Sequence, residues 1–447
     1  MRPFSKRDLI GYAMGDFGCN MCFALITNFM MLYYTQYIGL KSTDWAWIII
    51  VGKVWDAIND PIIGSMVDNV KLRSKSKFMP WITAGSIGII ITTTAIFLPI
   101  QNTSYGFKLV FCVAAYCVWS VVYTMANVPY GALHSCITDE PKQRTNLSTF
   151  RSIGAGLANA LLMLLPVIAY DENDNLKGEL FVWIALGGTI LGFFGFLLTR
   201  LLVTERVHIE APKQKFNYIA TLKGFFTNRP LIAATIVTVV QIICFMSMTP
   251  VNTIVFQTFF KNAKMSSVGT IVGYVPMVVL LPFIGKITAK IGKKGISVIG
   301  GAVGTAAGII AVFVPMDPAW KLSMPLWIVF LMFFYFSNAV FSILIWAMVV
   351  DCIDNQYERT GKREEGSVYA LYSFFRKLSQ GIGSAVSALA LSACGYVEAL
   401  GAAQTAQTAL NIKNMYLYFM LGGAVVTFVV MKFMYNIDDG KPGTAKQ

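Results

Sequence analysis

The stretch TDWAWIIIVGKVWDAINDPIIGSMVDNV, residues 43–70, places charged side chains in the middle of an apolar run. Its length fits a membrane-spanning helix, because about 20 apolar residues cross the hydrocarbon core of a bilayer. Lys53, Asp56 and Asp60 share one face of such a helix, and Asn59 borders that face. Each charge left in lipid would cost at least about 2.5–3.5 kcal/mol. The face must therefore turn towards water, a partner charge or a bound ion, and we predict that it belongs to a transport pathway.

The composition of the whole chain is that of a membrane protein. Of its 447 residues, 56% are hydrophobic and only 13% are charged, and the mean hydropathy is +0.61. Soluble domains of this size are less apolar, so we predict an all-α membrane protein that crosses the bilayer many times. The sequence contains no nucleotide-binding loop, metal-ligand spacing or nucleophile–base pair. We therefore expect neither an enzyme nor a resident cofactor.

The net charge of +13 follows the membrane topology. Basic residues concentrate in alternate loops, and the intervening loops carry one or two each. The basic clusters lie near residues 2–7, 71–77, 142–144, 206–223, 290–294 and 359–363. This positive-inside bias predicts that both termini are cytoplasmic. We expect a multi-pass protein of the bacterial inner membrane that works as a monomer and has the lipid bilayer, not nucleic acid, as a partner.

Apolar runs divide the chain into twelve predicted transmembrane spans. The first six cover approximately residues 9–38, 43–70, 80–100, 106–135, 147–170 and 179–203. A basic connector follows at residues 204–230. The other six spans cover approximately residues 231–260, 266–290, 296–316, 324–354, 366–395 and 412–436. We therefore predict twelve transmembrane helices in two six-helix bundles, residues 1–203 and residues 231–447, the second ending in a short cytoplasmic tail.

Short stretches recur at corresponding positions of the two halves. STFRSIGAG, residues 148–156, opens the fifth span, and SFFRKLSQGIG, residues 373–383, opens the eleventh. GSMVDNVKLRSKSK ends the second span, and GKITAKIGKK ends the eighth. Such parallel repeats are typical of transporters that bind substrate between their halves near the midplane. The alternative is chance resemblance between apolar helices.

Oxygen-bearing side chains on two spans predict a cation site. A hard cation such as Na⁺ requires several oxygens from carboxylates, amides and hydroxyls. Asp56, Asn59 and Asp60 supply three of these on the second span, and Thr124 supplies a fourth from the fourth span. We expect the coupling ion to be Na⁺, bound at these residues, or H⁺, carried by a carboxylate. The alternative is that the two carboxylates only hold helices together by pairing with Lys53 or Arg151.

Polar residues on four spans are candidates for substrate binding: Asp16, Asn20, Tyr123, Asn127, Arg151, Arg376 and Lys377. Arginine binds carboxylates and sugar hydroxyls well. The alternative for the three basic residues is that they extend to the cytoplasmic interface. Three further acidic residues, at the predicted cytoplasmic ends of spans, are expected to form ion pairs that gate the inward opening: Asp68, Asp351 and Asp354.

Five stretches resemble the glycoside–pentoside–hexuronide:cation symporters of the major facilitator superfamily. They are GYAMGDFGCN (11–20), KVWDAINDPIIG (53–64), YTMANVPYGAL (123–133), AKIGKKGISVIGGAVGT (289–305) and FRKLSQGIG (375–383). The resemblance covers essentially the whole chain. It implies two six-helix bundles that work by alternating access, with cation and sugar sites at their interface. It also implies that the cation ligands are Asp56, Asn59, Asp60 and Thr124.

The sugar-binding positions depart from the galactoside-carrying members of that family. Two positions that hold carboxylates in those members are Asn20 and Asn127 here, and a position that holds an aromatic residue is Gly131. Other family positions are retained: Tyr123, Arg151 and Lys377. Losing two negative charges while keeping the basic residues predicts a more positive cavity, which favours an anionic sugar. The resemblance therefore implies cation-coupled import of a glycoside, with a glucuronide as the preferred substrate.

Three other functions remain as alternatives. The first is a symporter of neutral pentosides or oligosaccharides, because the carriers of such sugars share many of the same sequence motifs. The second is a transporter of lysolipids or other amphiphiles, since Gly131 in place of an aromatic residue is compatible with a wide apolar cavity. The third is a sensor or scaffold that does not transport, and the intact cluster on the second span argues against it.

Overall fold

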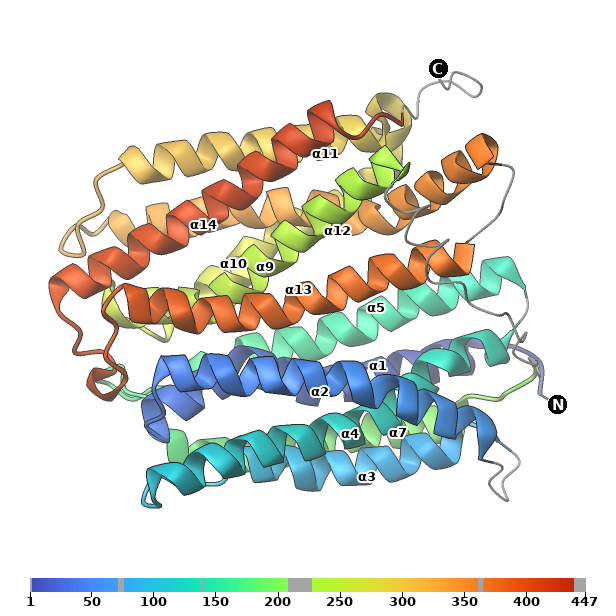
Figure 1. Cartoon of the computed structure of the whole chain (residues 1–447), viewed down its shortest axis with the longest axis horizontal. Coiled ribbons are helices and arrows are strands. Elements are labelled where there is room, and N and C mark those ends of the chain that lie inside the picture. Colours follow the sequence, from blue (N-terminus) through green and yellow to red (C-terminus); the bar gives the residue numbers. More distant parts are fainter. Residues whose placement is uncertain (1, 71–75, 139, 208–226, 361–364, 438–447) are drawn as a thin grey trace. The chain divides into compact units, whose positions relative to one another are not determined.

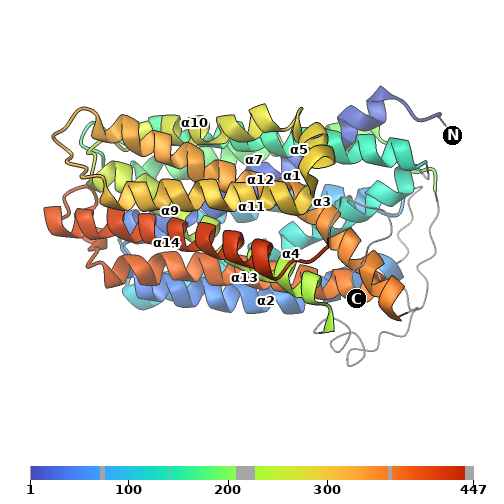
Figure 2. The same cartoon turned by 90° about the horizontal axis from the view of Figure 1, so that it is seen from above.

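The computed structural model describes residues 2–70, 76–138, 140–207, 227–360 and 365–437. Long helices make up nearly all the regular structure of these residues, as Figure 1 and Figure 2 show from two directions. The chain divides into two compact units. Unit 1 comprises Met1–Lys213 and Val397–Gly401, and unit 2 comprises Gln214–Tyr396 and Ala402–Gln447.

Unit 1 consists of helices joined by short connections. Its α-helices are α1 Lys6–Leu32, α2 Ser42–Asn69, α3 Met79–Ile96, α4 Tyr105–Ile137, α5 Pro141–Met163, α6 Leu165–Ala169 and α7 Phe181–Leu202. A π-helical turn, Tyr33–Tyr37, continues α1, and 3₁₀ turns lie at Gly178–Leu180 and Glu398–Leu400. The Glu398 turn lies between two helices of unit 2 along the chain. Its carboxylate accepts a hydrogen bond from the Ser42 amide at the start of α2, at 2.6 Å.

Unit 2 has the same all-helical character. Its helices are α9 Arg229–Thr258, α10 Met265–Leu280, α11 Ile284–Phe313, α12 Ser323–Thr360, α13 Glu365–Ala393 and α14 Ala406–Phe433. Proline in the first turn, where its missing N–H costs nothing, begins helices in both units: Pro80, Pro141 and Pro230.

Nine helices of the described part are long and apolar enough to cross a membrane. Helices α2 and α13 match them in length, with 28 and 29 residues, but carry charged side chains in their middle. Helix α10 has 16 residues and is shorter. These lengths and compositions are those of a multi-pass membrane protein, as the sequence predicts.

The predicted continuous span over residues 266–290 is wrong. Helix α10 ends at Leu280, and α11 begins at Ile284. Pro282 lies between them, and proline weakens a helix at its position because it has no N–H and crowds the preceding turn. Gly292 within α11 has a φ of +75°, a conformation that favours glycine. The bend at Gly292 lies where the sequence predicts the end of the span.

Other boundaries also differ from prediction, as two examples show. Helix α14 begins at Ala406, six residues before the predicted start, because Thr405 accepts a hydrogen bond from the Thr408 amide at 3.1 Å and caps the helix. Helix α12 extends to Thr360, beyond the predicted end at residue 354. Hydropathy marks the apolar core of a helix, whereas capping and polar extensions decide where it begins and ends.

Close packing of α1 fixes the polar residues that it carries. Helix α1 packs against α5 and α7. A Cβ atom added at Gly154 of α5 would lie 1.9 Å from the Ala13 carbonyl oxygen, and one at Gly18 would lie 2.6 Å from the Gly192 carbonyl oxygen. Only glycine permits such contacts between helix backbones. Asp16, between these contact points, is therefore held at a fixed depth in unit 1.

The predicted connector begins with residues that are fixed to unit 1. The Arg206 guanidinium pairs with the fully buried Asp8 carboxylate at 3.0 Å, and its amide donates to the Cys136 carbonyl at 2.7 Å. Glu205 accepts a hydrogen bond from the Lys77 amide at 3.1 Å, just before α3. Residues 204–207 thus join the ends of α1, α3 and α4, and residues 208–226 lie outside the described part.

Candidate functional site

The first polar cluster of unit 1 lies between α2 and α4. Gly52 allows the Tyr116 ring to lie flat on α2, since a Cβ atom there would be 2.3 Å from the ring. This contact brings the Tyr116 hydroxyl within 3.2 Å of Asp56, to which it donates a hydrogen bond. Ser120, one turn further along α4, also donates to Asp56. Lys53 completes the set, with its ammonium 3.0 Å from the same carboxylate.

A chain of hydrogen bonds joins the other predicted cation ligands. The Asn59 amide donates to the Thr124 hydroxyl at 3.2 Å, and this hydroxyl donates to the Asp60 carboxylate at 2.9 Å. Asn59 and Thr124 are each only 4% exposed. The structure therefore brings Asn59, Asp60 and Thr124 into direct contact, and Asp56 lies one turn earlier on the same helix. These four side chains contain the oxygen types that a hard monovalent cation requires.

The alternative interpretation was that Lys53 or Arg151 pairs with the carboxylates of α2 to hold helices together, and the one such pair described here lies within α2. Lys53 does pair with Asp56, and both side chains are about one-quarter exposed, at 24% and 25%. Arg151 does not pair with either carboxylate of α2. It pairs with Asp16 instead, with 2.9 Å between Nε and Oδ1. Lys53 thus pairs with the Asp56 carboxylate, and the Asp60 carboxylate accepts a hydrogen bond from Thr124.

The second polar cluster of unit 1 centres on that Asp16–Arg151 pair, which joins α1 to α5. The amide of Asn20 donates to the other Asp16 carboxylate oxygen at 3.1 Å and to the Asp16 backbone carbonyl at 2.9 Å. The Arg151 guanidinium lies 5.5 Å from the centre of the Tyr130 ring. Asp16, Asn20 and Arg151, all predicted substrate residues, are thus brought together.

The sequence predicts a more positive sugar cavity, partly because it keeps the positive charge of Arg151. Asp16 cancels this charge directly, so the pair is neutral. Asp16 lies 135 positions before Arg151, and nothing in the local sequence indicates which partner it takes.

Aromatic residues surround these clusters, and the sequence analysis identified one of them. Tyr123, a predicted substrate residue, stacks on Trp119 with 5.0 Å between ring centres and on Phe23 with 5.7 Å. Tyr12 stacks on Tyr130 at 4.7 Å. The spacing of Trp119 and Tyr123, one helical turn apart on α4, could have predicted that their rings stack. Asn127 lies one further turn along α4 and is partly exposed.

The remaining predicted site residues belong to unit 2 or lack a described side chain. Arg376 lies over the Trp346 ring, 5.2 Å from its centre, and Lys377 is exposed. Asp351 forms an ion pair with Lys293, which follows the Gly292 bend and links α12 to α11. Of the other two acidic residues predicted to form gating ion pairs, Asp354 is exposed, and the side chain of Asp68 lies outside the described part.

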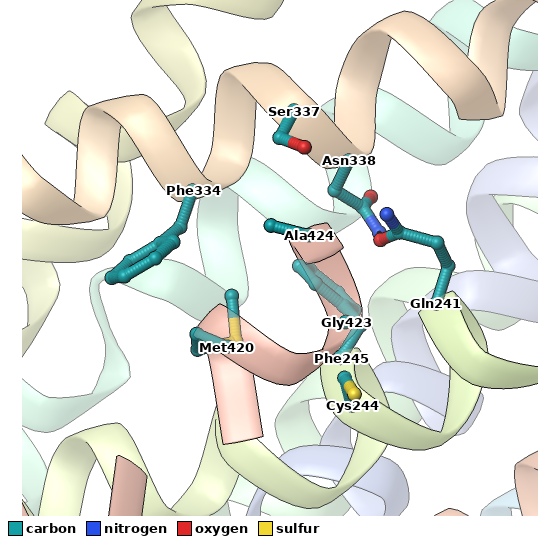
Figure 3. A pocket seen from close by; sticks show the side chains of 9 residues that line it. All are labelled: Gln241, Cys244, Phe245, Phe334, Ser337, Asn338, Met420, Gly423 and Ala424. Carbon is teal, nitrogen blue, oxygen red and sulfur yellow. The ribbon is translucent and has the colours of Figure 1, made fainter. Parts of the chain in front are cut away.

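Unit 2 contains a small polar cavity that the sequence analysis missed. It lies between α9, α12 and α14, and Figure 3 shows the amide groups of Asn338 and Gln241 next to one another at its edge. The Asn338 amide donates to the Gln241 carbonyl oxygen at 2.8 Å, and the Gln241 amide donates to Thr427 at 2.6 Å. The cavity volume of about 10 Å³ has room for about one water molecule and is far too small for a sugar ring.

Comparison with known proteins agrees with this architecture. A family model described as MFS/sugar transport protein matches residues 11–439. The glucuronide carrier protein homolog of Escherichia coli (strain K12) is 28% identical, over 98% of this chain and 94% of that protein. The isoprimeverose transporter of Lactiplantibacillus pentosus is 26% identical, over 99% of this chain and 90% of that protein.

The fold is similar to that of solved transporters. The crystal structure of a D-xylose–proton symporter superimposes with a TM-score of 0.68 at 11% sequence identity, covering 98% of this chain and 99% of that one. The predicted all-α, major facilitator architecture is therefore confirmed. Together with the family match along most of the chain, it shows that the chain belongs to the glycoside–pentoside–hexuronide:cation symporter family of sugar transporters.

Proposed function

We propose that the protein is a secondary active symporter, which imports a sugar glycoside together with a monovalent cation by alternating access. The observation that carries the proposal is the direct contact of Asn59, Thr124 and Asp60, with Asp56 one turn away. Two carboxylates, an amide and a hydroxyl on two packed helices exceed what a single structural ion pair requires. We further propose a location in the bacterial inner membrane with both termini in the cytoplasm.

The charge of the α2–α4 cluster supports a monovalent coupling ion. Asp56 and Asp60 carry two negative charges, and the Lys53 ammonium compensates one of them. This pairing offsets part of the negative charge available to a bound ion, which favours a monovalent over a divalent cation, because excess charge in a membrane-embedded site is costly.

We propose that cation binding rearranges the hydrogen bonds of this cluster. The Thr124 hydroxyl now points its proton at Asp60, and Asn59 presents its amide N–H to Thr124. A bound Na⁺ would take the oxygens of all three groups, so the hydroxyl must rotate and the Asn59 amide must turn over. A bound proton on Asp60 would require only a reversal of the Thr124 hydrogen bond.

We propose a glucuronide, or another anionic sugar of that type, as the preferred substrate. Arg151 uses its Nε for Asp16 and has a side chain that is 42% exposed, so the rest of its guanidinium is accessible. Guanidinium groups bind carboxylates through two parallel hydrogen bonds. Similarity to the glucuronide carrier protein homolog supports the same choice. Arg376 and Lys377 of unit 2 remain proposed substrate residues, as do Tyr123 and Asn127.

A neutral pentoside is the second candidate, and one observation favours it. The Asp16 carboxylate cancels the charge of Arg151, which lowers the attraction of this cluster for an anion. The similarity to the isoprimeverose transporter points in the same direction.

Uptake into proteoliposomes tests the proposal. A labelled aryl β-glucuronide is supplied with an inward Na⁺ gradient or a pH gradient, at matched membrane potential. Accumulation driven by Na⁺ supports Na⁺ coupling at Asp56, Asn59 and Asp60. Accumulation driven only by the pH gradient supports the symporter with these carboxylates as proton carriers. If folded protein gives no uptake under either gradient, the glucuronide assignment is wrong and neutral pentosides take its place.

A further inference from the structure

Asp16 is a buried carboxylate whose two oxygens are both engaged. Its side chain is 7% exposed. One oxygen accepts a hydrogen bond from Arg151 Nε at 2.9 Å, and the other accepts one from the Asn20 amide at 3.1 Å. A carboxylate in this position has little surface left for a sugar hydroxyl. Its partner Arg151 is six times more exposed, at 42% against 7%. Within the pair, the arginine is therefore the group that a ligand can reach.

Arg151 is held on two sides and open on the others. Its Nε is directed to Asp16, and its guanidinium lies against the Tyr130 ring, 5.5 Å from the ring centre. Tyr130 is itself fully buried and donates a hydrogen bond to the Tyr12 carbonyl at 2.6 Å. Within the described residues, the two terminal Nη groups of Arg151 have no hydrogen-bond partner. The two Nη groups of Arg151 therefore form a fixed pair of hydrogen-bond donors, and the Asp16 carboxylate compensates the guanidinium charge from the Nε side.

We propose that Asp16 sets the charge preference of the sugar site by acting through Arg151, as a positioning residue that does not itself touch the sugar. The inference rests on the proposed sugar transport and assigns Asp16 a role different from direct substrate binding. Asp16 orients the guanidinium and cancels its charge. The guanidinium can then bind a sugar hydroxyl or a carboxylate. The negative charge of Asp16 limits its affinity for an anion.

Limited anion affinity suits a carrier, which must release its substrate on the other side. An uncompensated arginine in a low-dielectric site would bind a sugar carboxylate strongly and release it slowly. The Asp16 charge opposes the incoming carboxylate across the guanidinium. Removing this charge without removing the hydrogen-bond acceptor separates the electrostatic role from the positioning role.

The test compares two ligands that differ at a single carbon. Methyl β-D-glucuronide carries a carboxylate where methyl β-D-glucoside carries a hydroxymethyl group. Dissociation constants of both are measured by titration calorimetry on the purified full-length protein, for the wild type and for Asp16→Asn. The asparagine keeps an oxygen for Arg151 Nε and loses the charge. We expect its preference for the glucuronide over the glucoside to rise about tenfold, as for the loss of one partly screened like charge.

Two further variants separate charge from position. Asp16→Ala removes the acceptor as well as the charge, so Arg151 loses its fixed orientation. We expect this variant to bind both sugars more weakly than Asp16→Asn does. Asp171→Asn, the same change at a partly exposed residue in the turn before α7, is the matched control and should leave both affinities unchanged. In Arg151→Lys, the effect of Asp16→Asn should shrink, because it acts through the guanidinium.

Each result of this test supports or overturns the inference. Equal weakening of both sugars in Asp16→Asn would mean direct contact with a sugar hydroxyl and would overturn the inference. An unchanged preference would assign Asp16 a purely structural role and overturn it as well. If the wild type binds neither sugar, the inference fails together with the proposed substrate. If it binds the glucuronide but no ion gradient drives accumulation, the proposed coupling alone fails and the Asp16 comparison still decides the inference.

Discussion

The polar cluster of α2 and α4 and the polar cavity of unit 2 bury hydrophilic groups in different ways. The first contains three ionisable side chains: Lys53 pairs with Asp56, and Asp60 accepts a hydrogen bond from the Thr124 hydroxyl. The second is lined by neutral amides, hydroxyls and apolar groups, with Gln241 hydrogen-bonded to Asn338 and Thr427.

The difference between them has a physical meaning. Neutral hydrogen bonds between membrane helices contribute only about 0.6 kcal/mol on average, and they cost little to bury. Ionised groups are far more costly to bury and persist only where a partner charge, water or an ion compensates them. The cluster that contains Asp56 and Asp60 is therefore expected to exchange an ion. The hydrogen-bonded amides beside the neutral cavity, which has room for about one water molecule, are expected to hold helices together.

The largest effect should come from neutralising the charged cluster. Asp56→Asn or Asp60→Asn removes the charge that attracts the cation, so accumulation in proteoliposomes should fall to the level of empty vesicles. Exchange of substrate across the membrane in the absence of an ion gradient should survive, since this exchange needs no net ion movement. Wild-type accumulation in both variants would contradict the assignment of this cluster as the coupling site.

The next largest effect should come from the hydroxyl that joins α4 to the cluster. Thr124→Ala removes the group bonded to both Asn59 and Asp60. We expect the cation concentration for half-maximal uptake to rise about tenfold, the size typical for lost ligand or supporting groups in ion sites. Thr124→Ser keeps the hydroxyl and should behave as the wild type. Equal loss in both variants would indicate a packing defect.

A packing change at the same cluster should reduce stability and disturb Asp56. Gly52→Ala places a methyl group where only 2.3 Å separates it from the Tyr116 ring. Overpacking of this kind costs about 1–3 kcal/mol, which thermal unfolding in detergent will detect. Tyr116→Phe removes the hydrogen bond to Asp56 and keeps the ring, so its stability should change less. A larger loss of stability in Tyr116→Phe than in Gly52→Ala would show that the Tyr116 hydroxyl contributes more to stability than the packing of its ring against Gly52.

The smallest effect is expected in the unit 2 cavity. Asn338→Leu removes the hydrogen bond to Gln241 and should lower stability by about 0.6 kcal/mol, the average for such bonds between membrane helices. Ion dependence of uptake should stay as in the wild type. A changed coupling ion or a changed half-maximal cation concentration would show that unit 2 shares in coupling and would remove the contrast between the two regions.

The helical spans follow from sequence because each depends on local hydropathy and length. The run at residues 43–70 predicts α2, Ser42–Asn69, within one residue at each end. The face that carries Lys53, Asp56 and Asp60 is equally local, since helical geometry alone places these residues together. Helix ends were less predictable, because single contacts such as the hydrogen bond from the Thr408 amide to Thr405 help to determine them.

Tertiary packing decided what the sequence left open. Whether Arg151 faces the carboxylates of α2 or Asp16 depends on how α1 packs against α5, and that packing rests on the contact of Gly154 with Ala13. The sequence determined by itself that a charged face exists in the membrane and that it needs compensation. Only the tertiary structure decided which charge compensates which, because ion pairs between helices depend on distances that residue spacing along the chain does not fix.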